Sequence, residues 1–186
     1  MKTNPVLSVC LVAALGCQVL LFSGCSSGYT RPTGQQPATA FKVSNQNPIS
    51  EVTVVVAPDV QAKLKDSLKF DQQALARTVE LALSNRQLLN AQKKEGAVVM
   101  QITVTHVRVR NTFNAVMWGA MSGNDSIKGD VVVKDANGGV VDQFHVDSAY
   151  ALGGFAGGQD SMRMNWLYEA FAKQVVRALT GEDKKN

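Results

Sequence analysis

Two histidines and a nearby aspartate are the side chains of this sequence best suited to metal or acid–base chemistry. His106 and His145 fall in segments that we expect to be strands, and Asp147 lies two residues beyond the second. Imidazole nitrogens and carboxylate oxygens are zinc ligands. However, the histidines have no fixed ligand spacing and no evident acidic partner. We therefore expect ordinary sheet positions, no metal and no cofactor.

Aspartates also recur every five to seven residues between positions 125 and 147. One of them opens Asp135-Ala136-Asn137-Gly138, which faintly resembles a calcium loop but lacks its third acidic ligand and its closing glutamate. Asn-Gly is a strong signal for a two-residue hairpin turn, because both residues can adopt positive φ. The sequence therefore predicts a turn here.

A glycine-rich segment, 153–158, precedes an amphipathic stretch, and glycine loops at helix N-termini can bind phosphate. A phosphate loop requires Lys and Ser or Thr after the last glycine, whereas Gln159 and Asp160 follow here. No Gly-X-Ser-X-Gly motif marks a serine nucleophile. We expect a strand-to-helix turn with Phe155 at its tip, and no enzymatic activity.

The elements that must position these residues are strands and two amphipathic helices. The patterns predict strands at 51–57, 97–110, 127–134 and 140–150, and helices at 71–86 and 160–180, with a short helical candidate at 60–65. Residues 40–44 are a weaker strand candidate. The order β-α-β-β-β-α indicates an α+β two-layer sandwich, in which a mixed sheet of about four strands carries two helices on one face.

Two local signals refine this pattern. The apolar face of 97–110 changes phase after Val104, and a bulge near Thr105–His106 would restore one continuous face. Asp71 is placed to cap the first long helix, with Phe70 and Leu75 as a hydrophobic staple.

An apolar segment, 113–121, lies between the predicted strands 97–110 and 127–134. Such a segment either folds back on the core or forms an exposed patch for a partner or a bilayer. Trp118 and Met121 are the expected anchors of such a patch, because large side chains bury much area at low entropy cost. The candidate partner-binding residues are Phe113, Met117, Trp118, Met121 and Phe155.

The N-terminus combines Lys2, an apolar run over 6–22 and the sequence Leu21-Phe22-Ser23-Gly24-Cys25. This resembles a bacterial lipoprotein signal peptide, with its leucine one residue earlier than usual. An uncleaved anchor, an ordinary secretory signal and processing at Cys17 are the alternatives. The resemblance implies removal of residues 1–24, acylation of Cys25 by palmitate-type chains and, because Ser26 follows, location on the periplasmic face of the outer membrane.

Composition limits what the remaining chain can do. All three cysteines lie within residues 1–25, so the expected mature domain has no thiol chemistry and no disulfide. It carries 18 basic and 15 acidic side chains, a net charge of +3, which with the periplasmic address argues against nucleic acid. We expect a tether over 25–48 with a reach of about 25 Å, one domain over 49–181 and a disordered tail over 182–186.

The C-terminal half resembles an uncharacterised family of bacterial lipoproteins, catalogued as a domain of unknown function. The resemblance covers 51–180 and rests on the segments 129–135 and 138–141 and on the glycine-rich segment before the last helix. It implies a fold similar to small periplasmic domains of envelope-assembly systems. No family function comes with it.

Two functions are consistent with these features. The first is a non-enzymatic, membrane-anchored module that binds an envelope protein or self-associates. The alternative is a module that binds a lipid or a peptidoglycan fragment between sheet and helices, in a pocket lined by Met162, Trp166 and Phe171.

Overall fold

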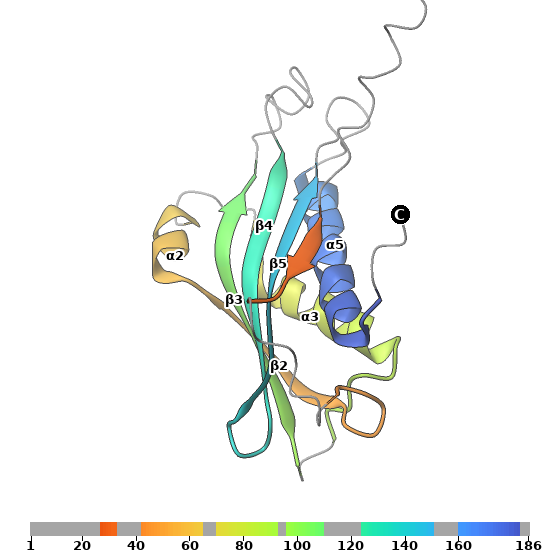
Figure 1. The fold of residues 1–186 in the computed structure, drawn as a ribbon. Coiled ribbons are helices and arrows are strands. Elements are labelled where there is room, and N and C mark those ends of the chain that lie inside the picture. Colours follow the sequence, from red (N-terminus) through yellow and green to blue (C-terminus); the bar gives the residue numbers. More distant parts are fainter. Residues whose placement is uncertain are drawn as a thin grey trace, which may run out of the picture.

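The computed structural model describes residues 27–32, 42–64, 70–92, 96–109, 124–150 and 160–182. These residues form an α+β fold in which two long helices cover one face of an open, five-stranded mixed sheet (Figure 1). The elements are β1 (Gly28–Thr30), β2 (Ile49–Val56), α2 (Pro58–Leu64), α3 (Gln72–Ser84), β3 (Val98–Arg108), β4 (Asp125–Lys134), β5 (Val140–Tyr150) and α5 (Asp160–Thr180). The predicted two-layer sandwich is confirmed, with one more strand than expected.

The strands are ordered β1-β5-β4-β3-β2, and only β2 and β3 are parallel. Parallel neighbours need a crossover connection, which α2 and α3 supply. The predicted cap of α3 is confirmed: Asp71 Oδ1 accepts hydrogen bonds from the backbone N–H groups of Gln73 and Ala74, at 2.8 and 2.9 Å. The second helix of the crossover, α3, therefore begins where the sequence predicts.

The predicted bulge in β3 is also confirmed. The pairing of β3 with β4 slips by one residue between Val104 and His106. Val104 is fully buried before the slip, and Val107 packs against the same core after it. The extra residue thus keeps the apolar side chains of a long strand on one face.

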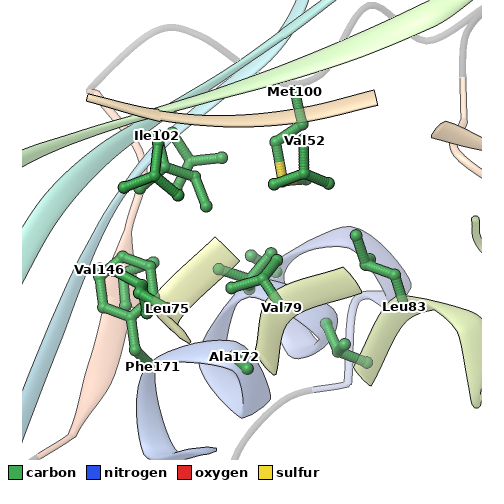
Figure 2. Packing of buried hydrophobic residues seen from close by; sticks show 14 of the residues in the cluster. Val52, Leu75, Val79, Leu83, Met100, Ile102, Val146, Phe171 and Ala172 are labelled. Atoms are coloured by element: carbon green, nitrogen blue, oxygen red, sulfur yellow. The ribbon is translucent and has the colours of Figure 1, made fainter. Parts of the chain in front are cut away.

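The core is a continuous apolar layer between the sheet and the two long helices (Figure 2). Leu75, Val79 and Leu83 of α3 are fully buried, as is Phe171 of α5. The helices also meet through Tyr168, whose hydroxyl accepts a hydrogen bond from the Asp71 backbone N–H at 2.7 Å. Burial raises the pKa of Tyr168 to about 12, so this hydroxyl is neutral at physiological pH.

The structure differs from the expected tether over 25–48. Gly28–Thr30 forms β1 on the edge of β5, and Val43 lies in the core. The sheet edge offers backbone partners that a short polar segment can use without an apolar pattern of its own. Within the described part of the weaker strand candidate, Val43 and Ser44 belong to no strand.

Candidate functional site

The face of the sheet opposite α3 and α5 carries a cluster of half-exposed polar side chains on β4 and β5. His145 Nδ1 lies 2.8 Å from Asp130 Oδ1, and Lys128 Nζ lies 2.5 Å from Asp147 Oδ2. Each pair joins residues directly opposite in the antiparallel register. The expectation that neither histidine has an acidic partner is therefore wrong for His145, because register places Asp130 beside it although 15 residues separate them in the chain.

His106 lies on the same row of the sheet, opposite Lys128 on β4. Lys128 in turn lies opposite Asp147, so a cation separates His106 from the carboxylate that would complete a metal site. Across the described ranges, no group of three or more His, Cys, Asp or Glu side chains could hold a metal ion. The arrangement is that of cross-strand pairs that stabilise a sheet.

The predicted hairpin turn is confirmed at 135–139, but not as a two-residue turn with positive φ at both Asn137 and Gly138: Gly138 has a φ of +80°, whereas Asn137 does not adopt positive φ. Asp135 Oδ1 accepts hydrogen bonds from the backbone N–H groups of Asn137 and Gly139, each at 2.9 Å. The carboxylate of Asp135 therefore orders the turn, which accounts for the residues that resemble a calcium loop.

A buried ion pair lies at the other end of the sheet. Arg163, near the start of α5, donates from Nη1 to Asp125 Oδ2 at 2.9 Å, and the two side chains are only 1% and 0% exposed. Asp125 begins β4 and follows the apolar segment 113–121, while Arg163 follows the glycine-rich segment 153–158. The pair thus connects the chain shortly after 113–121 to the chain shortly after 153–158.

The predicted lipidation residue, Cys25, lies outside the described residues. So do the predicted contact residues Phe113, Met117, Trp118, Met121 and Phe155. By connectivity, 113–121 joins the end of β3 to the start of β4, and 153–158 joins the end of β5 to α5. All of these element ends are at the same end of the sheet (Figure 1).

The predicted ligand pocket between sheet and helices is not formed by its three expected residues. Phe171 is fully buried in the core, whereas Met162 is 48% exposed. Trp166 packs its ring against Tyr150, with 5.0 Å between the ring centroids. Phe171 thus belongs to the buried core between the layers and Met162 does not, so the three residues do not line one common pocket.

A groove of about 1150 Å³ lies instead on the outer surface, between α3 and α5. Apolar residues of both helices contribute, and Leu81 is 62% exposed. An ion pair from Arg86 Nη1 to Glu182 Oε1, at 2.8 Å, links the C-terminal ends of the two helices. The lining residues are Thr78, Leu81, Ala82, Asn85, Arg86, Glu169, Ala172, Lys173, Val176, Arg177 and Glu182.

Sequence reasoning missed this groove. The periodic stripe of α3 runs through Leu75, Val79 and Leu83, and Leu81 falls outside it. An apolar residue off the buried stripe of an amphipathic helix is the signal that would have pointed to this surface.

Among the described residues, no helix combines the length and hydropathy needed to cross a membrane.

Fold and surface together define a small α+β domain in which two helices cover one face of a mixed sheet and cross-strand polar pairs lie on the other. Comparison with known families shows that the chain belongs to the family described as Domain of unknown function (DUF4410), whose profile matches residues 35–154. This confirms the predicted relation to a domain of unknown function. The profile ends before α5, which the predicted extent of 51–180 had included.

Several solved structures are similar to this one. Two crystal forms of the PelC dodecamer from Paraburkholderia phytofirmans have 12% and 13% identity and TM-scores of 0.47 and 0.45; each comparison covers 84% of this chain and 98% of the other. A DUF330 protein from Xanthomonas campestris has 12% identity and a TM-score of 0.42, with 83% of this chain and 95% of the other covered. The chain matches no curated protein.

Proposed function

We propose that this protein is an outer-membrane lipoprotein, held by acyl chains on Cys25, whose periplasmic domain is a non-enzymatic binding or assembly module for an envelope protein. The lipoprotein-type signal before Cys25 supports the anchor. The observation that carries the binding role is the groove between α3 and α5, because apolar residues of both helices line it and Leu81 is exposed there.

The chemistry of the groove favours a protein segment as its occupant. Its floor includes Ala82, Ala172 and Val176, and its rim carries both charge signs, as in Glu169 and Lys173. An amphipathic segment could cover the exposed face of the groove while its polar side chains meet the charged rim. Coverage of a large exposed apolar side chain such as Leu81 would favour association.

The anchor can be tested by metabolic labelling with radioactive palmitate and separation of the two membranes on a density gradient. We expect Cys25→Ala to lose the label and leave the outer-membrane fraction, because no other cysteine remains after cleavage. Cys17→Ala is the matched control and should keep both properties. Label retained by Cys25→Ala, or lost from Cys17→Ala, would contradict the proposed anchor.

The groove can be tested in intact cells with a photo-crosslinking amino acid at Leu81 and, as control, at Val140, which is 56% exposed at the start of β5. We expect one discrete protein adduct from Leu81 and none from Val140. Leu81→Glu should weaken co-purification of that same protein without unfolding the domain, because the side chain is largely exposed. Equal adducts at both positions, or a lipid adduct at Leu81, would argue against a protein-binding groove.

A further inference from the structure

The first described residues dock on the sheet very close to the proposed anchor. The backbone N–H of Ala149 donates to Ser27 Oγ at 3.2 Å, and Gly28 begins β1 opposite Asp147 of β5. Two residues of extended chain span at most about 7 Å. If Cys25 is acylated, the folded domain therefore begins within about 7 Å of the lipid-bearing residue, and the reach of about 25 Å predicted from a free tether does not apply.

A strong set of contacts holds β1 in place. Arg31 Nε and Nη2 donate to the two carboxylate oxygens of Asp142, at 3.2 and 2.9 Å, and Nη2 also donates to the Ala178 carbonyl oxygen at 2.8 Å. Its guanidinium carbon lies 5.5 Å from the ring centroids of both Tyr29 and Phe144. The hydrogen bond to Asp142 raises the pKa of Arg31, so the clamp stays charged. Bidentate pairs of this kind are directional as well as strong.

The direction of β1 fixes which end of the domain lies near the anchor. Because β1 is antiparallel to β5, its start lies beside the last residues of β5, at the end of the sheet that also holds Arg108 and Asp125. The hairpin turn lies at the opposite end. The 11 residues of β5 span about 36 Å between these ends.

We propose that β1 holds the domain end-on against the membrane, so that the end bearing Arg108 and Met162 contacts the phospholipid surface. This inference rests on the proposed acylation of Cys25. Met162 is 48% exposed near the start of α5, and Arg108 is exposed at the end of β3. A cation and an apolar side chain suit the boundary between lipid headgroups and acyl chains.

The test uses the full acylated protein in vesicles of phosphatidylethanolamine and phosphatidylglycerol that contain a headgroup-quencher lipid. A fluorophore is attached through Met162→Cys or, in a second sample, through Asn137→Cys in the hairpin turn. We expect the label on Met162→Cys to lose most of its emission and the label on Asn137→Cys to lose almost none. Adding Arg31→Ala should restore emission at the first site, because release of β1 frees the chain before β2. Arg77→Ala, which changes an exposed arginine on α3, should have no effect.

Equal quenching at both sites, or quenching that Arg31→Ala leaves unchanged, would overturn the end-on arrangement. Absence of quenching at Met162→Cys in protein that carries palmitate would overturn it while the anchor stands. Failure of palmitate incorporation would remove the anchor and the arrangement together, so the two proposals fail in distinguishable ways.

Discussion

Asp125→Ala is expected to lower the free energy of unfolding by about 3–5 kcal/mol. The substitution removes the carboxylate that Arg163 Nη1 contacts at 2.9 Å, at a site where the two side chains are 1% and 0% exposed. A charge held away from water is costly when its counter-charge is removed. Urea denaturation of the purified protein, followed by circular dichroism, measures the change.

The surface pair between Arg86 and Glu182 provides the matched control. Its N–O distance of 2.8 Å is nearly the same as that of the buried pair, but its side chains are 53% and 48% exposed. Arg86→Ala should therefore cost no more than about 1 kcal/mol. A double variant, Asp125→Leu with Arg163→Met, should lose less stability than Asp125→Ala, because it leaves no buried charge. Similar losses for Asp125→Ala and Arg86→Ala would show that burial does not set the strength of these pairs.

Local patterns in the sequence predicted most of the sheet and both long helices. The phase change after Val104 indicated the bulge in β3, since period-two alternation shows directly where a strand gains a residue. Asp71 and Asn137-Gly138 acted through neighbours within four residues, so their caps and turns were visible in the sequence. Each of these features depends on interactions over a short stretch of chain.

The features that the sequence did not reveal depend on distant residues. Nothing in the three residues of β1 shows periodicity, and the contact between Arg31 and Asp142 joins positions 111 residues apart. Arginine is a residue type typical of the solvent-exposed face of a helix, so the sequence does not show that Arg163 is buried. Only the fold places it against Asp125. The groove similarly requires two helices to lie side by side. Such pairings are set by topology, which local propensity does not encode.

Phe171→Ala is expected to be as disruptive as loss of the buried carboxylate, at about 3–5 kcal/mol. The ring is fully buried and lies against Gly129 in the middle of β4, where α5 packs on the sheet. Removing it leaves a cavity that two rigid layers cannot close. Urea denaturation again measures the loss, and Leu81→Ala on the exposed face of α3 is the control, with a change within about 0.5 kcal/mol.

Gly129 provides the reciprocal test of that packing. A β-carbon at this position would lie 3.2 Å from Phe171 Cζ and 3.1 Å from the Thr103 carbonyl oxygen, both tighter than ordinary contact. Gly129→Ala should therefore cost about 1–3 kcal/mol by itself. In the Phe171→Ala background the clash with the ring is absent and the methyl group fills part of the cavity, so the added cost should fall. Strictly additive losses would mean that the ring has room to move and that Gly129 does not set how closely α5 approaches the sheet.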